Sequence, residues 1–206
     1  IISYTGTGST GTIAHNLGAA PAWLLFKQRS EARDWMVYQH KNTSAPATDY
    51  LYLNSTAGTA TYNFWNNTSP TSTVFSVSSD SNVNSSSGEY IAYCWHSVAG
   101  YSKIGSYSGT SGNTIVYTTD DGTSGGSNPF QPSFVMIKKT NSSSNANWVI
   151  LDAARGSNTL FPDLASGEDV RSGLITYNSD NFTLTQAGSV SQVNNNSDSY
   201  LYMAFA

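Results

Sequence analysis

The chain has 206 residues, a net formal charge of −4 at pH 7, and a content of charged residues of only 11%. Its basic residues are scattered, so we expect neither a nucleic-acid partner nor binding to an anionic membrane surface. No apolar run approaches the roughly 18 residues of a membrane-spanning helix. The single cysteine, Cys94, cannot form an internal disulfide. The start, Ile1-Ile2, is not a signal peptide and indicates a fragment or a processed chain.

The composition predicts an all-β fold. Ser, Thr, Asn and Gly favour turns and loops, while the many Tyr, Trp, Phe, Val, Ile and Thr residues favour strands. In chain order, the predicted strands are 12–15, 22–28, 34–39, 50–54, 61–65, 74–77 and 90–98 in the first half, then 114–118, 133–139, 148–152, 174–177, 182–186 and 199–205. Only residues 162–173 could hold a turn of helix. Short strands at this spacing indicate an antiparallel β-sandwich, jelly-roll-like, with little helix.

The first half of the sequence recurs in the second. The matching segments are 21–27 with 132–138, 35–38 with 148–151, and 81–91 with 191–201. Ile1 aligns with Ile104, so the predicted repeats are 1–103 and 104–206, with no Pro- or Ser-rich linker between them. We expect two pseudo-symmetric copies that pack against each other. Because the copies share mainly apolar framework, function is expected in the loops that they do not share.

No residue pattern predicts catalysis, a metal site or a cofactor. Gly6-Thr7-Gly8-Ser9-Thr10-Gly11 matches G-x-G-x-x-G, but a dinucleotide site also needs a preceding strand and a following helix. The histidines lie in three separate segments without the spacing of metal ligands. Cys94, two residues before His96, reads as a small buried side chain. Asp120-Asp121-Gly122 reads as a turn, with Ca²⁺ binding as the alternative if further oxygens converge there.

Trp65 is the first choice for an exposed ligand platform. It lies in Asn63-Phe64-Trp65-Asn66-Asn67, beside a polar loop, whereas the tryptophans inside strand patterns are expected in the core. A sugar ring could stack on the indole, with Asn66 and Asn67 as polar partners. The alternative for Trp65 is a place in the core. The predicted ligand site is therefore Trp65, Asn66 and Asn67.

Several of these segments together resemble a domain found in structural proteins of tailed, largely marine, bacteriophages, often beside lectin-like modules. The segments that carry this resemblance are 132–138, 148–156, 182–184, Val193-Asn194 and 200–205 in the second copy, and 12–18, Pro21, 90–96 and 100–103 in the first. The motifs are structural, so no catalytic residue follows from them. The first copy lacks the Asp…Arg-Gly element of the second, and we expect Asp152 and Arg155 to bridge a strand and a loop.

The resemblance implies a non-enzymatic virion protein, in a fibre, in a tail or decorating the capsid, which serves particle assembly, stabilisation or host-surface contact. Its partners would be other virion proteins and copies of itself, with a trimer favoured, and its location would be the virion or the extracellular space. The loops 63–73, 106–113 and 120–131 are the candidate contact regions. The alternative is a carbohydrate-binding, lectin-like domain that recognises a host glycan. An enzyme that degrades polysaccharide would need two close carboxylates in a groove.

Overall fold

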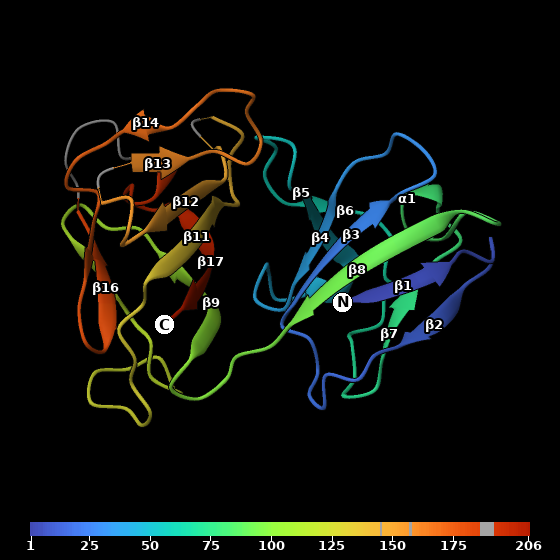
Figure 1. Ribbon diagram of the computed structural model, residues 1–206, viewed down its shortest axis with the longest axis horizontal. Helices are drawn as coiled ribbons and strands as arrows, with labels where there is room; N and C mark the ends of the chain where they lie inside the picture. Colours follow the sequence, from blue (N-terminus) through green and yellow to red (C-terminus); the bar gives the residue numbers. More distant parts are fainter. Residues whose placement is uncertain (145, 157, 186–191) are drawn as a thin grey trace. The chain divides into compact units, whose positions relative to one another are not determined.

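The computed structural model describes residues 1–144, 146–156, 158–185 and 192–206, and it confirms the all-β fold, with 38% strand and 4% helix (Figure 1). The chain folds into two units, the first comprising Ile1–Asn54 and Thr59–His96, the second Ser55–Gly58 and Ser97–Ala206. The chain enters the second unit after His96, ahead of the predicted repeat boundary at 103, because the strand at Ser102–Ser108 already pairs within that unit. The packing of the two copies against each other stays a prediction.

The first unit contains a six-stranded antiparallel sheet in the order β1-β8-β3-β4-β5-β6 and a second sheet of β2 and β7. Its elements are β1 (Ile2–Thr5), β2 (Gly11–Ala14), β3 (Trp23–Gln28), β4 (Met36–Gln39), the 3₁₀ helix η1 (Pro46–Thr48), β5 (Asp49–Tyr52), β6 (Ala60–Thr61), β7 (Val74–Val77), α1 (Ser81–Asn84) and β8 (Glu89–Trp95). Alternate residues of β3, such as Leu24 and Phe26, face one core together with Phe75 and Val77 of β7. This packing of two sheets is the predicted sandwich.

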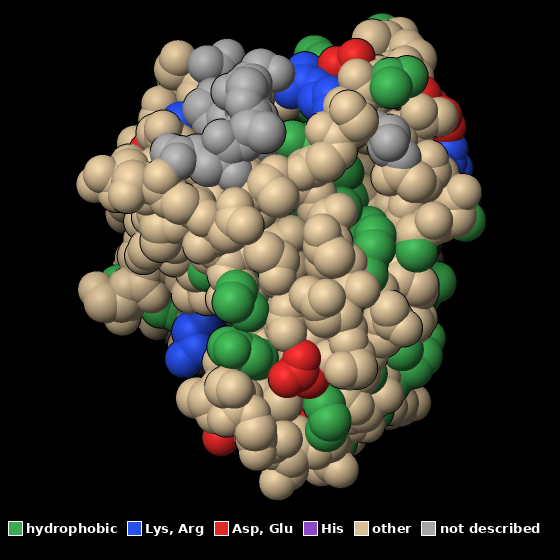
Figure 2. Space-filling view, turned by 90° about the vertical axis from the view of Figure 1, so that its left-hand side faces the viewer, with side chains coloured by type: hydrophobic (Ala, Val, Ile, Leu, Met, Phe, Trp, Pro, Cys, Tyr) green, Lys and Arg blue, Asp and Glu red, His purple; other side chains and the backbone are tan. Residues whose placement is uncertain are grey.

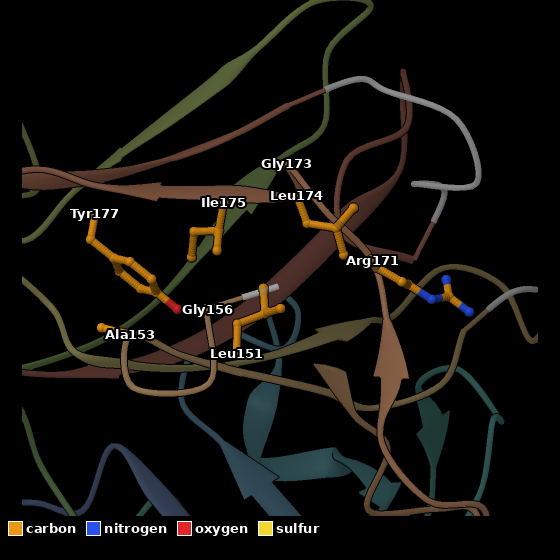
Figure 3. Close-up of a pocket in the computed structure, with 8 residues that line it drawn as sticks. All are labelled: Leu151, Ala153, Gly156, Arg171, Gly173, Leu174, Ile175 and Tyr177. Atoms are coloured by element: carbon orange, nitrogen blue, oxygen red, sulfur yellow. The ribbon is translucent and has the colours of Figure 1, made fainter. Parts of the chain in front are cut away.

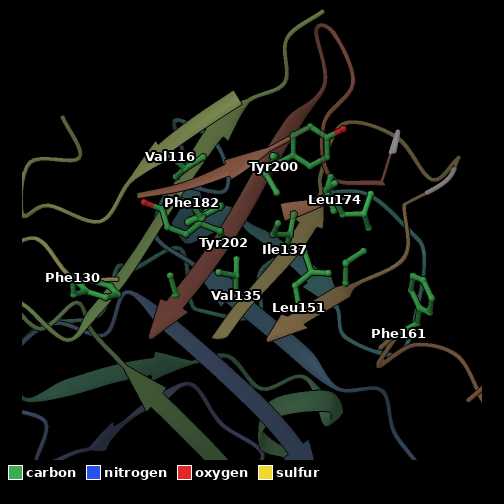
Figure 4. Packing of buried hydrophobic residues seen from close by; sticks show 14 residues of the cluster. Val116, Phe130, Val135, Ile137, Leu151, Phe161, Leu174, Phe182, Tyr200 and Tyr202 are labelled. Carbon is green, nitrogen blue, oxygen red and sulfur yellow. The ribbon is translucent and has the colours of Figure 1, made fainter. Parts of the chain in front are cut away.

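The second unit repeats this architecture. Its elements are β9 (Ser102–Ser108), β10 (Thr114–Tyr117), β11 (Phe134–Lys139), β12 (Val149–Asp152), β13 (Asn158–Leu160), β14 (Asp169–Val170), β15 (Ile175–Tyr177), β16 (Asn181–Leu184) and β17 (Ser199–Phe205). The large sheet has the order β9-β17-β11-β12-β13-β14, strand for strand that of the first unit, and β10-β16-β15 form the small sheet. Val135 and Ile137 of β11 pack with Phe182 of β16 and Tyr202 of β17 (Figure 4).

The structure contradicts two of the predicted secondary-structure elements. Residues 162–173 form no helix, because Asp169 and Val170 instead pair with β13 as a short edge strand. The predicted strand 61–65 ends at Thr61, since a tight turn, in which the Phe64 N–H donates to the Tyr62 carbonyl (3.0 Å), interrupts the alternation. The predicted strand 182–186 is present as β16, and its last residue lies outside the described residues.

A set of buried contacts among Tyr4, Tyr90, Val83 and Asn84, which we call the latch, explains why the Val-Asn motif occurs in the first unit. The ring of Tyr4 stacks on that of Tyr90, with 5.1 Å between centroids, and its hydroxyl donates to the Val83 carbonyl (2.5 Å). The Asn84 side chain, 1% exposed, accepts a hydrogen bond from the Thr7 N–H (2.8 Å) and donates to further backbone carbonyls. The latch ties the loop after β1 to the turn before β8.

The second unit contains the same latch. Tyr107 stacks on Tyr200 (4.9 Å), and its hydroxyl donates to the Val193 carbonyl (2.6 Å). The Asn194 side chain, again 1% exposed, accepts from the Thr110 N–H (3.0 Å). In both copies, a buried asparagine side chain therefore holds neighbouring loops by hydrogen bonds. This structural role explains why the asparagine recurs, without any role in binding.

One glycine per unit makes the latch possible. A Cβ atom on Gly6 would lie 2.1 Å from the Ser85 carbonyl oxygen, and one on Gly109 would lie 2.1 Å from that of Asn195. No side chain fits such an approach of two backbone segments. The sequence Ser-Tyr-x-Gly occurs at residues 3–6 and again at 106–109, because the tyrosine and the glycine belong to one packing arrangement.

The lysines that end the matching segments also have matching roles. Lys27 donates to the Arg33 carbonyl and Lys138 to the Ala146 carbonyl, each in the loop that follows its strand. Lys138 is fully buried, and this burial lowers the pKa of its ammonium group to about 8. The repeat is thus preserved in polar contacts as well as in the apolar core.

Candidate functional site

Trp65 is not an exposed platform, and this prediction was wrong. Its side chain is 2% exposed and packs against Phe26 and Tyr38, with ring centroids 5.0 and 5.9 Å away. The indole N–H donates to the Asp49 carbonyl (2.8 Å), so its one polar group is satisfied inside the core. The alternative considered from the sequence, a place in the core, is the one observed.

Asn66 and Asn67 are exposed, and their residue type suits a tight turn. Both have left-handed backbone angles, with φ of 52° and 49°, and the Thr68 N–H donates to the Trp65 carbonyl (3.1 Å) across them. Asn tolerates this region better than most residues. With Trp65 buried, the predicted site has lost its aromatic face.

Asp152 and Arg155 form the expected bridge at the end of β12. The guanidinium Nε lies 2.6 Å from Oδ2 of Asp152, and the Arg155 N–H donates to Oδ1 (2.9 Å). Arg155 also pairs with Glu168, which accepts from the Asn158 amide (2.8 Å). The bridge connects the loop after β12 to the segment before β14. Its arginine is 40% exposed, so the ion pairs contribute little stability, about 1 kcal/mol or less.

Asp120 and Asp121, the two carboxylates considered for Ca²⁺, accept hydrogen bonds from residues of their own loop. Oδ1 of Asp121 accepts from the Thr123 N–H (3.0 Å) and the Thr119 hydroxyl (3.1 Å), and these hydrogen bonds lower the pKa of Asp121. Oδ2 of Asp120 accepts from the Asn128 amide (2.7 Å). Among the described residues, no group of three or more His, Cys, Asp or Glu side chains could hold a metal ion.

One hollow of the first unit brings a histidine and the cysteine together. A cavity of about 180 Å³ is lined by His15, Cys94, the polar Asn16 and the apolar Ile1, Ile2 and Leu17. Nδ1 of His15 accepts from the Leu17 N–H (3.3 Å), and Nε2 lies 3.2 Å from the Thr71 carbonyl, which assigns the proton to Nε2. Burial raises the pKa of the Cys94 thiol to about 11. The thiol is therefore protonated at neutral pH, and the imidazole lacks a free acceptor to activate it.

The second unit contains a cavity of about 230 Å³ between the loop after β12 and strand β15. Leu151, Leu174 and Ile175 give it apolar walls, and Figure 3 shows the Tyr177 hydroxyl directed toward Gly156. That hydroxyl is buried and has no hydrogen-bond partner among the described residues.

The surface of the first unit contains an aromatic group that the sequence reasoning did not single out. We call Tyr50, Tyr52 and Tyr62 the tyrosine patch; they lie on β5 and directly after β6. Tyr50 meets Tyr52 and Phe64 edge to face, with centroids 5.0 and 4.7 Å apart, and Tyr62 packs on Phe64 at 4.6 Å. Tyr62 is 51% exposed. The signal in the sequence was the Tyr-x-Tyr spacing, which places Tyr50 and Tyr52 on one face of β5.

Two carboxylates accompany the tyrosine patch. Asp80 raises the pKa of the Tyr62 hydroxyl through its charge and a hydrogen bond. Burial, the neighbouring Tyr50 hydroxyl, and the charges of Asp34 and Asp80 raise the pKa of Tyr52. The patch therefore combines exposed aromatic carbon with hydrogen-bond acceptors, which is a usual composition for a polar-ligand site.

The register of the strands assigns the patch its counterparts in the second unit. Val37 pairs with Leu51 in the first unit as Ile150 pairs with Leu160 in the second, and Tyr50 pairs with Ala60 as Thr159 pairs with Asp169. When this register is extended along the chain, Tyr50 corresponds to Thr159, Tyr52 to Phe161 and Tyr62 to Arg171. Arg171 lies over the Phe161 ring at 5.0 Å and pairs with Asp169 (2.7 Å). The tyrosine patch is thus specific to the first unit.

The whole chain, residues 1–206, matches the family model DUF7483, a domain of unknown function, and the chain belongs to this family. No curated protein and no solved structure matches it. In the described part of the chain, no helix is long and apolar enough to cross a membrane.

Proposed function

We propose that this protein is a non-enzymatic structural module of a bacteriophage particle, in a fibre, in a tail or on the capsid. The observation that supports this most is the pair of matching latches, Tyr4 with Asn84 and Tyr107 with Asn194, in two units whose six-stranded sheets have the same strand order. Buried polar side chains preserved in both copies maintain shape, and a duplicated shape serves assembly and display. The resemblance of the sequence to tailed-phage structural domains adds the location.

The surface is consistent with display outside a cell. On the face shown in Figure 2, most of the area is uncharged, with few acidic or basic side chains and scattered hydrophobic ones. Such a surface has little electrostatic attraction for nucleic acid. In this proposal the module works as a symmetric oligomer, with a trimer favoured, and contacts other virion proteins or the host surface through its loops.

Locating the chain in purified particles tests the proposal. Particles of the source phage, banded by density, would be analysed by mass spectrometry and labelled for electron microscopy with an antibody raised against the chain. We expect label at one defined position of every intact particle. Detection of the chain only in the particle-free fraction of infected cells would contradict the proposal.

The alternative, a carbohydrate-binding domain, has one observation in its favour, which is the tyrosine patch. A fibre or decoration module can also carry such a site, so the two functions are compatible.

A further inference from the structure

The exposed ring of Tyr62 is held in place by its surroundings. Its N–H donates to the Thr48 carbonyl (3.0 Å), which extends the pairing of β6 with β5 by one residue. Its ring packs against that of Phe64, which is 3% exposed, with the two ring planes tilted by 47°. About half of the side chain remains open to solvent, at 51% exposure. A fixed aromatic face loses little conformational entropy when a flat apolar ligand surface stacks on it.

The polar neighbours of this ring are acceptors. Asp80 is the N-cap of α1, where Oδ1 accepts from the Asn82 N–H (2.7 Å). Asp34 accepts from the Asn54 amide (2.8 Å). In the described part of the chain, the ion pairs of Arg33, Lys139, Arg155 and Arg171 go to other carboxylates. The charges of Asp34 and Asp80 both act on the Tyr52 hydroxyl, so these carboxylates lie near the tyrosine patch.

The scaffold does not require this patch. The second unit builds the same two edge strands, β13 and β14, with Thr159, Phe161 and Arg171 at the corresponding positions. The six-stranded sheet keeps its strand order while the residues at these three positions differ, which indicates that the tyrosines serve something other than folding.

We propose that the tyrosine patch is a saccharide-binding site, in which a pyranose ring stacks its C–H face on Tyr62 and donates hydroxyl hydrogen bonds to Asp80. The sugar is neutral or an amino sugar. Sugars combine an apolar C–H face with a rim of hydroxyl groups, and the patch presents an aromatic face beside carboxylate acceptors. An anionic sugar, such as a uronic acid, would meet the charges of Asp80 and Asp34 and is excluded by repulsion.

The proposed contacts are one exposed ring and one carboxylate, so single-sugar affinity is expected to be weak, on the order of millimolar. Display of several copies on one particle would raise the effective affinity without any new contact. The inference about the ligand is independent of the particle's identity, since a sugar site could exist in a module that is not part of a virion.

Direct titration of the folded chain tests the inference. The probes are methyl glucoside, methyl galactoside, methyl mannoside, N-acetylglucosamine and glucosamine, with glucuronate as the anionic and choline as the cationic comparison. Binding is followed by saturation-transfer NMR and by shifts of tyrosine ring resonances. We expect at least one neutral or amino sugar to bind, glucuronate not to bind, and choline to bind more weakly than that sugar.

Matched variants assign the binding to the patch. Tyr62→Ala should weaken binding by about tenfold or more, whereas Tyr62→Phe, which keeps the ring, should stay within about threefold of the parent. Asp80→Asn keeps the helix cap and should weaken binding through loss of a charged acceptor. Tyr101→Ala removes a tyrosine of similar exposure, 55%, in the second unit and should leave binding unchanged.

Three results would overturn the inference. They are failure of every sugar to bind the parent chain, binding by Tyr62→Ala equal to that of the parent, and tighter binding of choline than of any sugar. The last result would assign the patch to ammonium groups through cation–π contacts. None of these results bears on whether the chain resides in a phage particle, so failure here and failure of the structural proposal are distinguishable.

Discussion

The two units build the same sheet and differ at its last two strands. In the first unit, Tyr50 and Tyr52 of β5 and Tyr62, directly after β6, form the patch. In the second, the corresponding positions hold Thr159 of β13, Phe161 directly after it, and Arg171, which follows β14 and pairs with Asp169. The Tyr–Tyr stack, the Asn latch and the close-packed glycine are the same in both. The comparison teaches that shared residues maintain the fold and that the differing edge is free to acquire binding chemistry.

The close-packed glycines should give the largest effects. Gly6→Ala and Gly109→Ala place a methyl group against a backbone carbonyl, so the loop must shift, and we expect a loss of about 2 to 4 kcal/mol in the free energy of unfolding. Gly112→Ala is the control, because nothing lies within 4 Å of its Cβ position. Urea denaturation measures all three. Equal stability of the three variants would show that the latch geometry is not essential.

The latch asparagines should come next. Asn84→Ala and Asn194→Ala leave the Thr7 and Thr110 N–H groups without their acceptors, and each should cost about 2 kcal/mol. The two losses should be similar, because the hydrogen bonds are equivalent. A loss of stability in only one of the two variants would mean that the asparagines do not stabilise the two copies equally. The measurement is again the free energy of unfolding.

Alkaline pH should weaken both units through the same tyrosines. Burial raises the pKa of Tyr4 and of Tyr107 above the unfolded value of 10.0, so above pH 10 the unfolded chain releases protons that the folded chain retains. Stability is therefore full below pH 10 and falls above it, by about 1.4 kcal/mol per pH unit for each such tyrosine. Tyr107→Phe should reduce the slope of unfolding free energy against pH. An unchanged slope would contradict the assignment.

The bridge at Arg155 should give the smallest effect. Arg155→Ala removes ion pairs to Asp152 and Glu168 that are partly exposed, so we expect a loss below about 1 kcal/mol that shrinks further in high salt. Lys27→Ala provides a comparison in the first unit, where a cationic side chain caps a loop carbonyl. A loss of several kcal/mol for Arg155→Ala would show that the bridge organises the second unit.

The strand pattern and the duplication could be predicted from the sequence, because alternation and recurrence are local properties of it. The short edge strands β6, β13 and β14 could not, since two or three residues carry no clear period. The recurrence of Val83-Asn84 was visible, whereas its latch with Tyr4 needs residues far apart in the chain.

The candidate site was harder to predict than the fold. Polar neighbours made Trp65 look exposed, but the turn at Tyr62–Phe64 places Phe64 and Trp65 inside and leaves Tyr62 outside. Asp80 is distant from Tyr62 in the sequence, and only the folding of the chain brings the two side chains together. Asp152 and Arg155 were placed correctly because they are three residues apart, within the reach of local geometry.

The most direct test of the division between scaffold and binding edge is the free energy of unfolding of Tyr62→Ala beside that of Asn84→Ala. Tyr62 is half exposed and specific to one unit, so its removal should cost about 1 kcal/mol or less, while Asn84→Ala should cost about 2 kcal/mol. A loss for Tyr62→Ala as large as that for Asn84→Ala would place the tyrosine patch in the scaffold and contradict the account.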